Sequence, residues 1–264
     1  MGEFFTQLKD HLSLDLNEYS IDETNVYLVA SLPNKFQQQS ELKFGFPRLR
    51  EIIALNEPSS PLNFSNIKIY YITTSINSIT SDLLISLAEA LFGNRERFWD
   101  EIKNRKQTFL DTFRIIYPST NYVNGSFAGS KVIKCLFLKS FAYNHCKFQK
   151  SVLRKFSGNS KINGNNQVVP HLKALIAIRN NHIDDDTIIY TGSHNFTKAA
   201  WGSFCKKNQT YEGFNYEVGI VMPPRKGTRL AKIDLISKLG VNLEASHYDG
   251  KDTPFFADTN DTEN

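Results

Sequence analysis

The segment PHLKALIAIRNNHIDDDTIIYTGSHNFTKAAWG, from Pro170 to Gly202, contains the clearest alternation of structural elements in the chain. Its apolar runs predict strands over 172–178 and 187–191, separated by a polar turn over 180–186. A Gly-Ser-x-Asn turn follows the second strand, and a helix is expected from about Phe196. The segment therefore predicts two neighbouring strands whose polar ends lie close together.

Three polar side chains in this segment have the chemistry that phosphodiester hydrolysis requires. His171 and Lys173 are two positions apart on the first predicted strand, so their side chains leave the same face at backbone positions about 6.5–7 Å apart. An imidazole titrates near neutral pH and can deliver or remove a proton. The Lys173 ammonium and the Asn195 amide can donate to non-bridging oxygens as these gain charge. We predict that His171, Lys173 and Asn195 are catalytic.

The His-x-Lys spacing alone is a weak signal, because a second triplet occurs at His145-Cys146-Lys147. That triplet lies among apolar and basic residues without glycine or proline, which predicts a helix. No strand with a Gly-Ser-x-Asn turn follows it. We expect the second triplet to have no catalytic role.

A metal site is a further hypothesis, because His182 precedes Asp184, Asp185 and Asp186, and His194 lies nearby. Adjacent carboxylates in a polar turn point in different directions and rarely converge on one ion. We expect no metal and no cofactor.

The sequence resembles the C-terminal half of the tyrosyl-DNA phosphodiesterases, a branch of the phospholipase D superfamily. The resemblance rests on Pro170-His171-x-Lys173, on SHNFTKAAWG from Ser193 to Gly202, and on Tyr216-Glu217-Val218-Gly219. Earlier matches are ETNVYL from Glu23 to Leu28 and IYPS from Ile116 to Ser119. Ordinary phospholipases of the superfamily place an aspartate five residues after the lysine, where this chain has Ile178. That departure favours the DNA-repair branch.

The resemblance implies a metal-independent hydrolase that releases a topoisomerase I tyrosine, or another adduct, from a DNA 3′ end in two covalent steps. A histidine from the other half would form a phosphohistidine. His171 would protonate the leaving tyrosine and then activate water. Lys173 and Asn195 would hold the phosphoryl oxygens, and Glu217 would orient the histidine of the other half.

Three residues are expected to bind the DNA backbone. The loop NYVNGSFAGS, residues 121–130, can present backbone N–H groups and hydroxyls to a phosphate, although a plain turn is equally compatible with its composition. The resemblance favours Ser126 as a contact. Thr197 and Lys198 stand at a predicted helix start, where backbone N–H groups attract anions, and the resemblance makes them phosphate contacts.

Positive charge is concentrated around the predicted site. Residues 112–183 contain no Asp or Glu, while the chain of 264 residues has a net charge of only +4. Such a distribution favours an anionic partner, and single-stranded or 3′-end DNA fits best. Aromatic residues alternate with lysines over 131–156. We expect these aromatics mainly in the core, with the lysines facing solvent.

Alternating strands and helices predict an α/β layered sandwich, with a mixed β-sheet flanked by helices on both faces. We expect residues 1–256 to form one phospholipase D-like half-domain and residues 257–264 to form a disordered acidic tail. No apolar run approaches the ~20 residues of a membrane helix, so no membrane partner is expected. Three cysteines without CxxC spacing are expected to be buried free thiols: Cys135, Cys146 and Cys205.

The remaining predicted elements follow from apolar periodicity and from proline and glycine positions. Strands are expected over 25–31, 67–73, 113–117 and 217–222. Helices are expected over 3–13, 46–55, 81–92, 96–106 and 229–239.

The resembled family uses two His-x-Lys motifs, one in each half, and only the second is matched here. We therefore expect this chain to begin just after the N-terminal half and to be inactive without it. Expected partners are that half, DNA and a topoisomerase I-derived tyrosyl peptide, in the nucleus. Two alternatives remain. One is a nuclease that dimerises so that two copies of His171 share a site, and the other is a non-catalytic nucleic-acid-binding module.

Overall fold

The computed structural model describes the following residues, and the structural statements below concern these alone: 25–37, 43–56, 58–59, 64–92, 104, 106–127, 129, 134–157, 161–162, 166–169, 171–205, 210–240 and 242–258.

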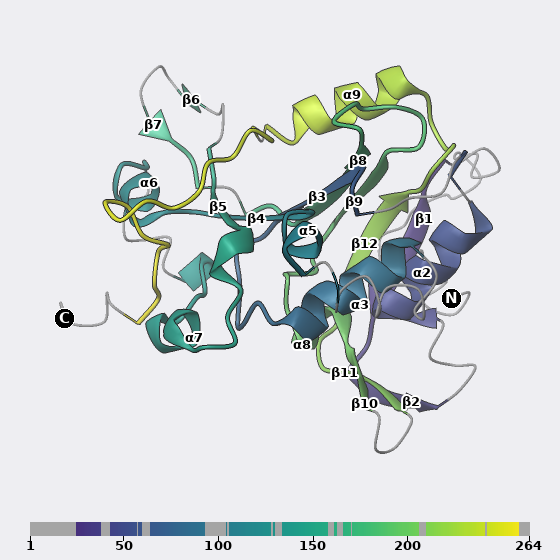
Figure 1. The fold of residues 1–264 in the computed structure, drawn as a ribbon, viewed down its shortest axis with the longest axis horizontal. Helices are drawn as coiled ribbons and strands as arrows, with labels where there is room; N and C mark the ends of the chain where they lie inside the picture. The colour runs from purple at the N-terminus through teal and green to yellow at the C-terminus, as the bar shows by residue number, and fades with distance from the viewer. Residues whose placement is uncertain are drawn as a thin grey trace, which may run out of the picture.

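A seven-stranded mixed sheet forms the centre of the molecule (Figure 1). Its strand order is β1-β12-β9-β8-β3-β4-β5. The pairs β3–β4 and β4–β5 are parallel, and the other pairs are antiparallel. The strands are β1 (Tyr27–Ser31), β3 (Ile67–Ile72), β4 (Phe113–Tyr117), β5 (Leu153–Lys155), β8 (Ala174–Arg179), β9 (Ile188–Gly192) and β12 (Glu217–Met222).

Helices lie on both faces of this sheet, as Figure 1 shows, with α9 on one side and α2 and α3 on the other. They are α2 (Gly45–Leu55), α3 (Ser81–Phe92), α5 (Lys106–Leu110), α6 (Thr120–Asn124), α7 (Ser140–Asn144), α8 (Lys198–Trp201) and α9 (Arg229–Lys238).

Two hydrophobic cores follow from the alternation of side chains along each strand. Leu175 belongs to the larger core, together with Leu84 of α3. Its neighbour Ile176 belongs to the smaller core, together with Ile189 of β9 and Ile236 of α9. The predicted sandwich, a mixed sheet with helices on both faces, is confirmed.

Two smaller sheets and a 3₁₀ turn complete the described elements. A three-stranded sheet has the order β10-β11-β2, and a short hairpin joins β6 to β7. Their bounds are β2 (Asn34–Gln37), β6 (Lys161–Ile162), β7 (Asn166–Gln167), β10 (Ser203–Cys205), β11 (Thr210–Gly213) and the 3₁₀ turn Lys150–Val152. No helix in the described part of the chain is long and apolar enough to cross a membrane.

Most predicted elements are present within a residue or two. The strands expected over 25–31, 67–73, 113–117 and 217–222 correspond to β1, β3, β4 and β12. The helices expected over 46–55, 81–92 and 229–239 correspond to α2, α3 and α9. The helix predicted over 3–13 and most of the helix predicted over 96–106 lie outside the described residues.

Two local predictions are wrong because short-range polar contacts decide them. The loop predicted over 121–130 overlaps helix α6, whose Ser119 cap accepts a hydrogen bond from Tyr122 N–H at 3.2 Å. The helix predicted around His145 ends at Asn144, and His145 Nδ1 instead accepts from the Lys147 N–H at 3.2 Å.

The predictions for the tail and the cysteines also need correction. Asp258, placed in the disordered tail by composition, accepts hydrogen bonds from Ser140 N–H and Oγ at 2.9 Å each. This contact orders the chain at least to that residue. Cys135 and Cys146 are exposed, and Cys205 is partly exposed, so the three free thiols are not buried.

Candidate active site at one edge of the sheet

The register of the central strands brings the predicted site residues to one edge of the sheet. Ala174, the first residue of β8, pairs with Ile72 at the end of β3 and with Thr191 near the end of β9. Gly192 pairs with Gly219 near the start of β12. The segments that leave these strand ends therefore meet at a single edge.

His171 and Lys173 are in contact at this edge. Both precede β8 rather than lying within it, which corrects the predicted strand start at Leu172. Lys173 Nζ lies 2.7 Å from His171 Nε2. The Lys173 side chain is only 4% exposed, whereas His171 is exposed. The predicted pair is therefore formed, with a buried amine beneath an accessible imidazole.

Burial shifts both groups toward their neutral forms, and the charge of Lys173 adds to the shift of His171. Desolvation lowers the pKa of His171 first, and the Lys173 charge lowers it further. Desolvation also lowers the pKa of Lys173, while nearby Glu217 and Cys135 act in the opposite direction. At 2.7 Å the two nitrogens cannot both donate. The contact fits a neutral imidazole that accepts from the ammonium.

Asn195 is held by the residues that follow β3. Its Oδ1 accepts hydrogen bonds from Thr73 Oγ1 at 3.1 Å, Thr74 Oγ1 at 3.2 Å, Thr74 N–H at 3.3 Å and Ser75 N–H at 2.9 Å. We call Thr73, Thr74 and Ser75 the β3 clamp. Because the amide is planar, anchoring its oxygen on the clamp directs its two N–H groups away from β3.

The turn that carries Asn195 is also fixed by buried aromatic side chains. Tyr71 OH donates to His194 O at 2.8 Å and accepts from Trp201 Nε1 at 2.6 Å. His194 itself is fully buried, with Nδ1 2.5 Å from Tyr190 OH and Nε2 2.9 Å from Ser31 Oγ. Burial lowers the pKa of His194 to about 3, so this ring stays neutral. Both ring nitrogens of His194 therefore have partners within the protein, and the ring helps to hold the turn in place.

Glu217 reaches the same edge as the first residue of β12. Ser193 ties the turn to this strand, since Ser193 N–H donates to Val218 O and Ser193 Oγ accepts from Val218 N–H, both at 2.9 Å. Glu217 Oε1 accepts from Asn215 Nδ2 at 3.1 Å. Its charge also acts on Lys173. The structure therefore brings Glu217 together with His171, Lys173 and Asn195.

The three predicted DNA contacts make different local interactions. Ser126 Oγ donates to Val123 O at 2.7 Å and accepts from Gly129 N–H at 3.2 Å, within its own turn. Thr197 is buried and caps α8, where its Oγ1 accepts from Ala200 N–H at 3.1 Å. Lys198 is exposed. Their contacts with DNA remain predictions.

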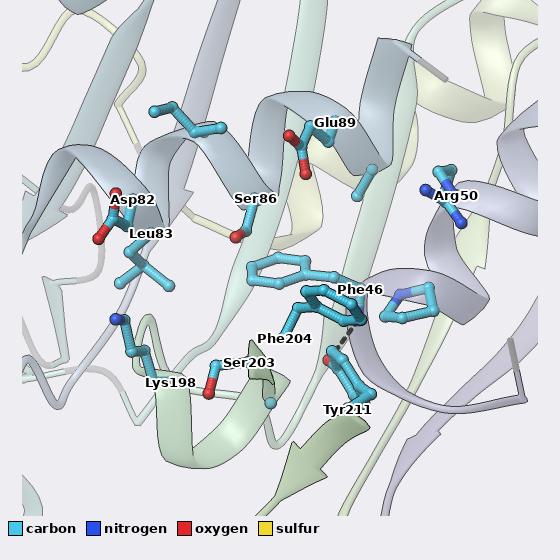
Figure 2. A pocket seen from close by; sticks show the side chains of 14 residues that line it. Phe46, Arg50, Asp82, Leu83, Ser86, Glu89, Lys198, Ser203, Phe204 and Tyr211 are labelled. Atoms are coloured by element: carbon cyan, nitrogen blue, oxygen red, sulfur yellow. Dashed lines mark hydrogen bonds between the residues drawn. The ribbon is translucent and has the colours of Figure 1, made fainter. Parts of the chain in front are cut away.

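Lys198 lines a separate pocket of about 510 Å³ between α2, α3, α8 and the β10–β11 strands. Figure 2 shows its ammonium reaching toward Asp82 and Leu83 of α3, with Phe46, Phe204 and Tyr211 further along. The side chain therefore points toward the start of α3, from a helix that begins three residues after Asn195.

The acidic turn between β8 and β9 is occupied by protein contacts. Asp186 is 2.8 Å from Arg179 Nη2 and accepts from Ser59 N–H at 3.0 Å. Asp184 Oδ1 accepts from the Asp186 N–H at 3.0 Å. Among the described residues, no group of three or more His, Cys, Asp or Glu side chains is arranged to hold a metal ion.

Sequence reasoning missed the β3 clamp and Cys135. The polar run Thr73-Thr74-Ser75 directly after a strong apolar strand was an available signal, because polar residues at strand ends commonly line sites. Nothing in the sequence indicated that Cys135 would lie near enough to act on the charge of Lys173.

The fold and this edge place the chain in the phospholipase D-like class, and comparisons with known proteins are more specific. Residues 3–256 match the family model described as tyrosyl-DNA phosphodiesterase. The chain belongs to the tyrosyl-DNA phosphodiesterase family.

Solved structures show the same fold. A crystal structure of the yeast tyrosyl-DNA phosphodiesterase matches with a TM-score of 0.58 at 15% identity, covering 88% of this chain and 57% of the yeast chain. A histidine-to-asparagine mutant of that yeast protein gives 0.59 at 17% identity, with the same coverage. A histidine-to-alanine mutant gives 0.58 at 15% identity, covering 96% of this chain and 64% of that one. This chain thus spans less than two thirds of the length of these relatives.

Proposed function

We propose that this chain supplies one half of the active site of a DNA-repair phosphodiesterase, which hydrolyses the 3′-phosphodiester between DNA and a topoisomerase I tyrosine or another 3′ adduct. The 2.7 Å contact between His171 and Lys173 is the observation on which this proposal rests most heavily. It sits at the same sheet edge as the clamped amide of Asn195. Family membership supports the same reaction class.

In this mechanism a histidine from outside the described site attacks phosphorus. A P–N bond forms, the P–O bond to tyrosine breaks, and protonated His171 gives its proton to the departing phenolate. His171 then removes a proton from water. The water oxygen bonds to phosphorus, the P–N bond breaks, and the products are DNA with a 3′-phosphate and a free histidine.

Lys173 and Asn195 stabilise the charge that develops on the non-bridging oxygens. Burial of Lys173 makes its ammonium more effective, because a charge in a water-excluded site interacts more strongly. The clamp supports the same role for Asn195, since an amide already held in one orientation loses no freedom when the transition state forms. Glu217 orients the attacking histidine, which comes from the other half.

The second histidine is proposed to come from the N-terminal half that the longer family members contain. The other His-x-Lys triplet of this chain does not form an equivalent pair, because His145 Nδ1 is bonded to the Lys147 backbone. We also propose a nuclear location, because the proposed substrate is DNA. Imaging a fluorescent fusion of the chain tests this location.

The decisive experiment uses an oligonucleotide with a 3′-phosphotyrosyl end and follows tyrosine release. We expect the 264-residue chain alone to release none, and release to begin when the N-terminal half is added as a separate chain. The His171→Ala chain should not support release in the mixture, whereas the Lys238→Ala chain should. Activity that rises per molecule with the concentration of this chain alone would instead indicate a shared site in a self-dimer. Release from the lone chain independent of concentration would overturn the half-site proposal.

A further inference from the structure

An aromatic and basic surface lies beside the candidate site. Composition placed the aromatic residues of 131–156 mainly in the core, and Phe148 and Phe156 are buried as expected. Phe137 and Phe141 are not, with exposed fractions of 39% and 68%. Lys139 Nζ lies 5.7 Å from the Phe137 ring centroid and 5.8 Å from that of Phe141. We call Phe137, Lys139 and Phe141 the aromatic–basic patch.

This patch is continuous with the β3 clamp. Phe137 N–H donates to Thr74 O at 2.9 Å, and Ile76 N–H donates to Phe137 O at 2.7 Å. Ser75 pairs with Phe137 in a parallel bridge, and the same Ser75 donates to Asn195. The backbone that positions the Asn195 amide therefore also positions the first ring of the patch.

A second link runs through Cys135, two residues before Phe137. Cys135 is exposed and is among the groups whose charge acts on Lys173. The patch thus follows a residue that acts electrostatically on the amine of the site, and it continues to α7, where Phe141 lies.

The chemistry of the patch fits a single-stranded nucleic acid. Exposed ring faces accept bases by stacking regardless of their identity, and lysines between the rings meet the phosphates. The patch lies within the segment 112–183, which has no Asp or Glu. A carboxylate near the patch is that of Asp258, whose oxygens accept hydrogen bonds from Ser140 and whose pKa is lowered in part by the charge of Lys139. An acidic peptide would use Lys139 but would leave both rings unused.

We propose that the aromatic–basic patch is a stacking platform for the single-stranded DNA whose 3′ end enters the site. A base stacks on the Phe141 ring, and Lys139 contacts an adjacent phosphate. This inference rests on the proposed function for the direction of the strand, but binding itself requires no catalysis. A binding measurement therefore separates its failure from a failure of the proposed reaction.

The test measures fluorescence anisotropy of a labelled single-stranded oligonucleotide with the full chain. Phe141→Ala should weaken binding roughly tenfold, because one stacked base is lost. Phe141→Trp should restore it, and Phe141→Leu, which keeps an apolar side chain without a ring, should not. Phe204→Ala, an exposed aromatic on β10, is the matched control and should leave the affinity unchanged.

An abasic strand of the same length distinguishes stacking from charge. Wild type and Phe141→Ala should bind the abasic strand equally, because it offers phosphates without bases. Equal losses for Phe141→Ala and Phe204→Ala on the normal strand would overturn the proposal. The proposal would also be overturned if Phe141→Ala weakened binding to the abasic strand as much as binding to the normal strand. Preferential binding of anionic lipid vesicles over the oligonucleotide would overturn it as well.

Discussion

At the scale of single residues, the Lys173–His171 contact decides which nitrogen holds a proton before substrate arrives. An ammonium that donates to Nε2 keeps that nitrogen unprotonated at rest. A phosphate between the two groups would separate them and favour a charged imidazole, because the phosphate charge opposes that of Lys173. Substrate binding would thus prepare His171 to act as an acid.

Replacing Lys173 with Met should raise the pKa of His171. The Lys173 charge lowers that pKa, and removing it leaves desolvation as the remaining cause of the downward shift. NMR titration of the His171 ring signals measures this without any activity assay. Lys198→Met is the control and should leave the His171 titration unchanged. An unchanged or lowered pKa in Lys173→Met would contradict the electrostatic coupling described here.

At the scale of elements, the turn between β9 and α8 depends on a neutral histidine. The folded protein holds the pKa of His194 at about 3, while an unfolded chain has the usual value near 6.5. Between these values the unfolded state binds a proton that the folded state does not. Stability contributed by His194 is therefore lost as the pH falls from 6.5 toward 3.

His194→Gln should make the protein less sensitive to mild acid, because glutamine can hydrogen-bond without titrating. Between pH 7 and pH 5, wild type should lose about 2 kcal/mol more unfolding free energy than the variant. Urea unfolding at both pH values measures the difference. His247→Gln, on an exposed histidine away from the turn, is the comparison. Parallel pH profiles of wild type and His194→Gln would show that the ring titrates normally.

Helix α9 is anchored by a lysine with no exposed surface. Lys232 Nζ donates to Asp185 O and Thr187 O at 2.6 Å each, and to Pro223 O at 3.2 Å. Desolvation lowers its pKa to about 8, although Asp184, Asp185 and Asp186 favour its charge. The helix is thereby tied to the turn between β8 and β9 and to the residue after β12.

Lys232→Met should lower the unfolding free energy by about 2–4 kcal/mol, since it leaves three carbonyl groups without their donor. Lys238→Met, exposed on the same helix, should cost less than about 1 kcal/mol. The folded pKa lies below the unfolded one. Wild-type stability should therefore rise relative to Lys232→Met as the pH goes from 8 toward 10. Chemical denaturation at several pH values across that range measures both unfolding free energies. A difference between wild type and Lys232→Met that shrinks as the pH rises would contradict the lowered pKa of Lys232.

The accuracy of sequence-based expectations also differs from element to element. Long apolar runs such as 174–178 identified the strands, and the His-x-Lys spacing identified a real contact. The polar run after β3 was visible in the sequence, but its partner was not predictable, because Thr74 contacts a residue more than a hundred positions away. The exposure of Phe141 was not predictable either, because it depends on which elements pack against α7. Sequence periodicity does not show how elements pack against one another.

At the scale of the whole molecule, the uneven distribution of charge should govern DNA binding. If about four phosphates are neutralised, log K for single-stranded DNA should fall with log salt at a slope near −3. Lys147→Gln, exposed within the carboxylate-free segment, should reduce the slope by about 0.7. Lys238→Gln on α9 should not change it. Isothermal titration at several salt concentrations gives the slopes, and a slope near zero would exclude backbone recognition.

The position of β12 between β1 and β9 has a consequence for how the chain folds. Tyr27 of β1 pairs with Val221 of β12. The sheet is therefore incomplete until β12, late in the described chain, has been synthesised. Partners this distant in sequence slow folding. A nascent chain that stops before Glu217 leaves β9 as an open edge and β1 without its described neighbour, and such edges are templates for aggregation. Translation past β12 supplies the strand that covers the β9 edge and pairs with β1.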